Sequence, residues 1–255
     1  MIVAMPLVLR PILILILFTS VLPALAGPSP LDPRPEGFTK VHFGFKAGLA
    51  VTQHQGIEPR DMEYMVSSSM RTGMAAGAFL ILPVTGRFGI QQEVLYVQKG
   101  SRQKIGADVL TVPVTMDVTY DQDYLEIPVL LRYHWITGRK TGFYTLAGFS
   151  FGLKINDRYK LSAVLDDGVD QVPIQADSDM SEVDLFDFAF TYGIGLEFPV
   201  ADNWLLLEYR FDLSLQALPL PTYAYVPFGD DEILVENETV PLRNQAHILM
   251  VGFRF

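Results

Sequence analysis

The chain has 255 residues, of which 49% are hydrophobic and only 19% are charged, so disorder is excluded as its main state. Its 19 Lys and Arg residues against 29 Asp and Glu residues give a formal net charge of −10, which argues against nucleic acid as a partner. The absence of cysteine excludes a disulfide framework, a thiolate nucleophile and a cysteine-ligated zinc site.

Residues 1–26 have the features of a secretory signal peptide. A single charge, Arg10, precedes an apolar run over residues 11–25, and Ala24-Leu25-Ala26 places small side chains where signal peptidase requires them. We therefore predict cleavage before Gly27. The alternative, a retained membrane helix, would need about 20 apolar residues. Residues 27–39 are rich in proline and are expected to form an extended periplasmic leader.

The rest of the chain repeatedly alternates apolar and polar residues, which is the period of a β-strand. The alternation is clearest in residues 40–52, 124–135, 186–198 and 205–215. In residues 186–198 one face carries Phe186, Phe188, Phe190, Tyr192, Ile194, Leu196 and Phe198, and the other carries Asp187, Ala189, Thr191, Gly193, Gly195 and Glu197.

The two faces differ in a way that favours a membrane barrel. Large aliphatic and aromatic side chains suit contact with lipid, while charges and glycines suit a narrow lumen. The stretches also have the roughly 9–11 residues that a tilted strand needs to cross the hydrocarbon. We predict an all-β fold, a transmembrane antiparallel up-and-down β-barrel of about eight strands formed by residues 40–255. A soluble lipocalin-like barrel or another all-β sheet remains an alternative.

Eight strands are expected, and their connections alternate in length. Residues 83–87, 136–142 and 199–203 form short links, whereas residues 53–69, 101–117, 156–182 and 218–244 form long ones. In outer-membrane barrels the short turns are periplasmic and the long loops extracellular. We therefore expect both termini in the periplasm. The strands are expected near residues 40–52, 70–82, 88–100, 118–135, 143–155, 183–198, 204–217 and 245–255.

Four stretches resemble successive strands of the PorT-type outer-membrane β-barrel domain, a family common in the Gram-negative Bacteroidetes. They are residues 89–100 (GIQQEVLYVQKG), 124–133 (YLEIPVLLRY), 143–152 (FYTLAGFSFG) and 192–209 (YGIGLEFPVADNWLLLEY). The Leu-Glu-Ile-Pro step at residues 125–128 and Gln98-Lys99-Gly100 are the most specific marks, and the resemblance covers most of residues 38–255. It implies an outer-membrane barrel, and for some relatives a link to a secretion and gliding apparatus.

The strand phase also predicts which charged side chains face the lumen, where an unpaired ion is costly. Six acids and six bases fall on that face, among them Lys40 and Lys99 at strand ends, and we expect them to form a salt-bridged core. The predicted lumen network consists of Lys46, Glu93, Glu126, Arg132, His134, Asp187, Glu197, Glu208, Arg210, Asp212 and Arg254. The outward residues Val251, Phe253 and Phe255 resemble the signal that outer-membrane barrels present to their assembly machinery.

Enzymatic and metal-binding motifs are not found. No histidine pair has the i, i+4 spacing of a zinc protease, and neither a Gly-x-Ser-x-Gly elbow nor a phosphate loop occurs. His42 and His134 are expected inward, His247 outward, and His54 in the first long loop. The acid-rich third loop lacks the calcium-loop spacing and is expected to be solvated or to bridge divalent ions. Pro128 cannot donate to a strand ladder and predicts a local bulge.

The sequence therefore predicts an outer-membrane barrel with a closed lumen and a structural or interaction role, without catalytic residues, metal or cofactor. A subunit of a secretion or envelope complex is the second hypothesis, and a lipid-modifying enzyme the third. The expected partners are outer-membrane lipid and lipopolysaccharide, the barrel assembly machinery and a possible envelope protein.

Overall fold

A computed structural model describes the chain from residue 40 onward, with internal gaps. The described residues are 40–55, 66–85, 87–109, 112–137, 141–166, 171–179, 185–219, 223–228, 231–236 and 241–255. The predicted signal peptide and the predicted leader lie outside them.

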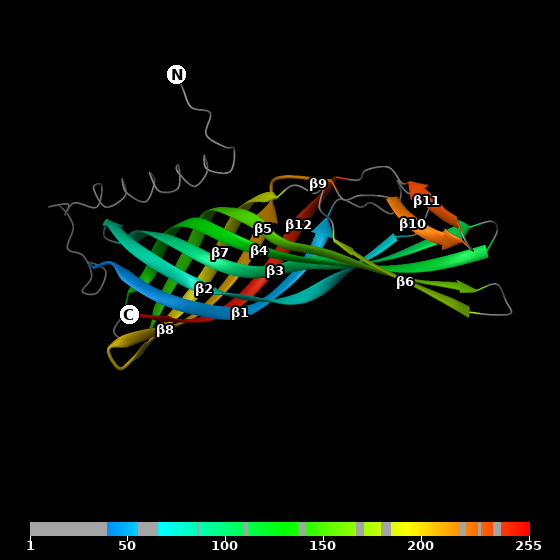
Figure 1. The fold of residues 1–255 in the computed structure, drawn as a ribbon. Helices are drawn as coiled ribbons and strands as arrows, with labels where there is room; N and C mark the ends of the chain where they lie inside the picture. Colours follow the sequence, from blue (N-terminus) through cyan, green and yellow to red (C-terminus); the bar gives the residue numbers. More distant parts are fainter. Residues whose placement is uncertain are drawn as a thin grey trace, which may run out of the picture.

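Eight strands close into an antiparallel barrel, so the predicted fold class is confirmed (Figure 1). Each strand pairs with the next along the barrel, and the last pairs with the first from Gly44↔Arg254 to Gln55↔Arg243. Closure leaves no free edge within the membrane, where an unpaired backbone group would be costly. The barrel strands are β1 (His42–Gln55), β2 (Val66–Thr85), β3 (Phe88–Val109), β4 (Val112–Thr137), β5 (Gly142–Asp166), β7 (Phe186–Val200), β8 (Asn203–Ser214) and β12 (Pro241–Arg254).

Four further strands lie outside the barrel. β6 (Gln171–Asp179) pairs with β5, and β9 (Leu218–Pro219) pairs with the start of β12. β10 (Tyr223–Phe228) and β11 (Asp231–Glu236) form a separate hairpin.

The second and third long connections are therefore not loops throughout, as the sequence analysis expected. β3 and β4 run on until Val109 pairs with Val112, and β5 runs on to Asp166 before β6 returns along it. The ends of β2 to β5, together with β6, form an antiparallel sheet that extends beyond the barrel, here called the projecting sheet (Figure 1). It comprises residues 66–70, 101–109, 112–123, 156–166 and 171–179.

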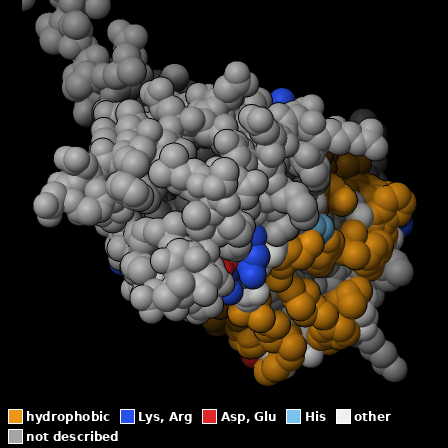
Figure 2. All heavy atoms as spheres, turned by 90° about the vertical axis from the view of Figure 1, so that its right-hand side faces the viewer, with side chains coloured by type: hydrophobic (Ala, Val, Ile, Leu, Met, Phe, Trp, Pro, Cys, Tyr) orange, Lys and Arg blue, Asp and Glu red, His pale blue; other side chains and the backbone are white. Residues whose placement is uncertain are grey.

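Where Figure 2 shows the outer wall of the barrel, that wall is largely apolar. Phe45, Leu49 and Leu249 are each more than half exposed, as expected for side chains that meet lipid. Aromatic pairs gather at the end with the short turns: the ring centroids of Phe43 and Phe255 lie 5.2 Å apart. Phe88–Tyr133 and Tyr133–Trp135 lie 4.7 and 4.8 Å apart, and such a girdle marks a membrane interface.

Both ends of the barrel chain lie at this girdle. The backbone N–H of Phe255 donates to the carbonyl oxygen of Phe43 at 2.9 Å. The connections β2–β3, β4–β5 and β7–β8 are at the same end, and the projecting sheet is at the opposite one (Figure 1). No helix in the described part of the chain is long and apolar enough to cross a membrane.

Pro128 lies in β4 without the predicted bulge. The β3–β4 pairs on either side of it, Gln92↔Val129 and Leu95↔Glu126, keep the same register, so no residue is inserted. Ile127 and Pro128 have no paired residue on β3, while Pro128 pairs with Ser150 on β5. The missing N–H is thus accommodated by a gap in the β3–β4 ladder.

Candidate functional site: the ion-pair network of the lumen

The barrel interior contains charged side chains from most of its strands. Every residue of the predicted lumen network is at most 5% exposed, and so is Lys99. Because strand residues alternate between the two faces, each of these side chains points inward, and most of them lie between outward apolar neighbours. Lys40 differs from the expectation: it lies before β1 begins and is exposed, so it is not part of the lumen.

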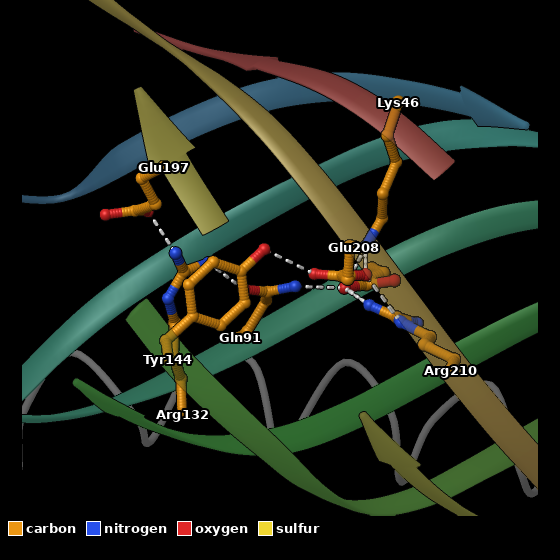
Figure 3. A network of polar contacts seen from close by, with 8 residues as sticks. Lys46, Gln91, Arg132, Tyr144, Glu197, Glu208 and Arg210 are labelled. Carbon is orange, nitrogen blue, oxygen red and sulfur yellow. Dashed lines mark hydrogen bonds and ion pairs between the residues drawn. The ribbon is translucent and has the colours of Figure 1, made fainter. Parts of the chain in front are cut away.

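The centre of the lumen holds two cations between two carboxylates, here called the quartet (Figure 3). Lys46 Nζ lies 2.6 Å from Glu93 Oε1 and 2.9 Å from Glu208 Oε1. Arg210 Nε lies 2.6 Å from Glu208 Oε1, and its guanidinium also contacts Glu93. Each ion therefore touches both ions of opposite charge, and the quartet is neutral as a whole.

A second cluster closes the lumen toward the short turns. Arg132 contacts Glu197, and Arg254 Nη1 lies 3.1 Å from Glu197 Oε1. The Arg132 guanidinium stacks 3.5 Å above the centre of the Tyr144 ring. Tyr144 Oη donates to Glu208 Oε2 at 2.9 Å, which connects this cluster to the quartet (Figure 3).

His134 belongs to this second cluster, with Nε2 3.5 Å from Glu197 Oε2. The Tyr144 ring fits because Gly195 faces it across the β5–β7 pair. A Cβ at position 195 would lie 2.0 Å from the Tyr144 ring.

A third cluster lies on the side of the projecting sheet. Lys99 Nζ lies 2.6 Å from Glu126 Oε1 and 3.0 Å from Asp187 Oδ2. Ser214 Oγ donates to Asp187 Oδ1 at 2.5 Å, and Ser150 Oγ donates to Glu126 Oε2 at 3.4 Å.

Sequence reasoning named the charged members of the network and missed its neutral ones. Gln91 contacts Glu93 and accepts from Arg132 Nη1 at 2.5 Å, so it joins two clusters. Tyr144 and the two serines were missed in the same way. Their inward strand phase was the available signal, but an uncharged side chain on that face is not distinctive.

His54 was expected in a loop, but it lies in β1 and is buried. Its Nδ1 is 2.7 Å from Ser101 Oγ. No carboxylate contacts His54 among the described residues, so this pair lacks the acid of a catalytic triad.

The other histidines occupy separate places. His42 lies at the start of β1, with Nδ1 3.2 Å from the carbonyl oxygen of Phe255. His247 is on the outer wall, 2.7 Å from Tyr209 Oη. Within the described ranges, no group of three or more His, Asp and Glu side chains is placed to hold a metal ion.

Several solved structures of outer-membrane proteins align with the chain. Ail, the attachment invasion locus protein of Yersinia pestis, is 12% identical, with 84% of this chain and 98% of Ail covered and a TM-score of 0.34. Neisserial surface protein A is 14% identical (83% and 95% covered, TM-score 0.34), and OprG of Pseudomonas aeruginosa is 11% identical (84% and 94%, TM-score 0.38). At these values the likeness carries no information about function.

None of the curated proteins matches the chain. The family model described as "Outer membrane protein beta-barrel domain" matches residues 31–218, from the predicted leader through seven of the eight barrel strands. Together with the closed barrel, this match shows that the chain belongs to the outer membrane protein β-barrel domain family.

Proposed function

We propose that the protein is a closed outer-membrane barrel with an interaction role, which holds the projecting sheet outside the cell for contact with another protein. The observation that carries the proposal is the combination of a filled lumen with a sheet that extends past the membrane. An eight-stranded barrel encloses an interior just wide enough for side chains. Here ion pairs occupy that interior, so the barrel is better suited to support the projecting sheet rigidly than to act as a channel.

The base of the projecting sheet is stiffened on its outer face. Arg71 Nε reaches across β3 to Asp121 Oδ1 on β4 at 2.8 Å, and Arg71 Nη1 donates to the carbonyl oxygen of Lys99. Gly100, at φ +142°, lies beneath it, and a Cβ there would be 2.0 Å from the Tyr120 oxygen. Asn156 Nδ2 donates to Asp123 Oδ2 at 2.9 Å between β5 and β4.

The edges of the projecting sheet support contact with another chain. Among the described residues, β6 pairs only with β5, and residues 66–70 pair only with β3. Unpaired strand edges accept an added strand through backbone hydrogen bonds, which is a common mode of protein recognition. This interaction role includes that of a subunit in a PorT-type secretion or envelope complex.

We propose three further partners: outer-membrane lipid, lipopolysaccharide and the barrel assembly machinery. Outer-membrane lipid and lipopolysaccharide would surround the apolar wall. The assembly machinery would bind Val251, Phe253 and Phe255. The first two lie on the outward phase of β12, Phe255 follows its end, and Val251 and Phe255 are exposed. The termini and the short turns would face the periplasm, since the aromatic girdle, the start of β1 and the C-terminal residue lie opposite the projecting sheet.

One labelling experiment in the producing organism tests this role. Cysteines at Asp166 and Asp231 are expected to react with a membrane-impermeant benzophenone maleimide on intact cells, while cysteines at Gly86 and Asp202 react only after lysis. Illumination should then join the two surface positions to a discrete protein partner. Leu249→Cys on the lipid-facing wall is the control and should give no protein adduct.

Each part of the proposal has its own contrary result. Labelling at Asp202 but not at Asp166 on intact cells would reverse the orientation. Surface labelling without any protein adduct would reject the interaction role.

A further inference from the structure

We propose that Asp212 binds a proton in the folded barrel, because among the described residues it is the buried carboxyl group that no cation contacts. This inference is independent of the proposed function, since it concerns only the charge inside the lumen. Its starting point is the distribution of cations among the three clusters.

The cations are unevenly placed along the lumen. The quartet is neutral, and the second cluster has Arg132 and Arg254 around Glu197 alone. The third cluster has only Lys99, which contacts Glu126 and Asp187. Lys154 is the remaining buried cation among the described residues, and it is paired with Asp157 at 2.6 Å.

Asp212 lies on the side of the third cluster without any ion pair. It is 3% exposed and points inward from β8, and its Oδ1 has no hydrogen-bond partner. The adjoining strands place Thr191 (β7) and Ala246 (β12) opposite it, so they contribute no charge at that level. Thr191 Oγ1 is likewise buried without a partner.

The charged groups that act on Asp212 do not compensate it. Glu126 of β4 repels a negative charge there, while Lys99 of β3 and Arg210 of β8 attract it. Both of those cations already contact two other carboxylates. Glu126 and Asp187 also accept hydroxyl hydrogen bonds from Ser150 and Ser214, in addition to their contacts with Lys99.

A buried carboxylate without a counterion is expected to take up a proton from solvent, because the neutral acid costs far less to desolvate than the anion. The proton therefore supplies the positive charge that the described cations do not provide at Asp212.

Two isosteric substitutions separate this proton from an ordinary ion pair. Asp212→Asn is neutral without taking up a proton, so it should raise the equilibrium constant for folding into lipid vesicles at pH 7 by more than about tenfold over wild type. Glu93→Gln is the matched control, and it should lower that constant by at least about 100-fold because it leaves Lys46 and Arg210 poorly compensated. The folded wild type binds one proton more than the unfolded chain above about pH 4, so its stability should fall relative to Asp212→Asn as pH rises.

Infrared spectroscopy observes the proton directly and needs no stability measurement. The folded wild type at pH 7 should show the C=O absorption of a protonated carboxyl group, and Asp212→Asn should lack it. Absence of that absorption from the wild type would overturn the proposal, and so would a loss of stability in Asp212→Asn equal to that in Glu93→Gln. A wild-type stability that depends on sodium or potassium rather than choline would assign the missing charge to a metal cation instead.

Discussion

Replacing Arg210 with methionine is expected to lower the free energy of unfolding by about 3–5 kcal/mol, which is the usual cost of removing one partner from a buried ion pair. Methionine fills similar space without a charge. It leaves the buried carboxylates of Glu93 and Glu208 with Lys46 as their shared cation. Urea-dependent folding into lipid vesicles measures the difference.

Two controls show whether the loss of stability comes from the carboxylates that Arg210→Met leaves without their second cation. Arg102→Met removes an exposed cation from the projecting sheet and should change stability by less than about 0.5 kcal/mol. Replacing all four quartet residues with apolar ones should recover much of the loss, because well-packed apolar side chains often substitute for a buried ion pair. If the quadruple variant is less stable than Arg210→Met, the quartet contributes stability to the barrel that apolar packing does not replace.

Leu207→Arg should also be strongly destabilising, by about 2–4 kcal/mol, because it places a cation on the lipid face near the membrane midplane. Leu207 is 39% exposed on the outer wall of β8. It pairs with Val251 on β12, and Val251 pairs in turn with Ala47, midway along the apolar face of β1.

Leu215→Arg is the matched control for this substitution. Leu215 is also outward and exposed, but it follows the end of β8 on the side of the projecting sheet, so the cost should be about 0–1 kcal/mol. The same folding assay ranks the two variants. Equal costs would show that the outer wall near Leu207 does not meet the hydrocarbon core.

The inward and outward faces of the barrel strands could be predicted from the sequence because the side-chain period of a strand is two. Arg210 and Glu197 were assigned to the lumen by their phase alone, and both are buried there. Such an assignment is robust within a membrane, since a shift of one residue would expose every charge to lipid.

The partners of these side chains could not be predicted in the same way. Lys46 contacts Glu93, 47 residues away, and Glu208, 162 residues away. Which residues share a level in the lumen depends on the stagger of all eight strands around the barrel. A single sequence carries no direct record of that stagger.

The ends of the strands were the least predictable part. Lys40 fits the inward phase but precedes β1, whereas His54 was expected in a loop and is buried at the end of that strand. Beyond the membrane both faces of a strand can meet water, so the apolar alternation weakens. This explains why the strands of the projecting sheet were taken for loops.

The central claim is that ion pairs close the lumen, and electrical recording tests it most directly. Purified protein inserted into a planar lipid bilayer should show no stable open level, because the quartet and its neighbouring clusters occupy the interior. A steady conductance of the size seen for porins would contradict the account.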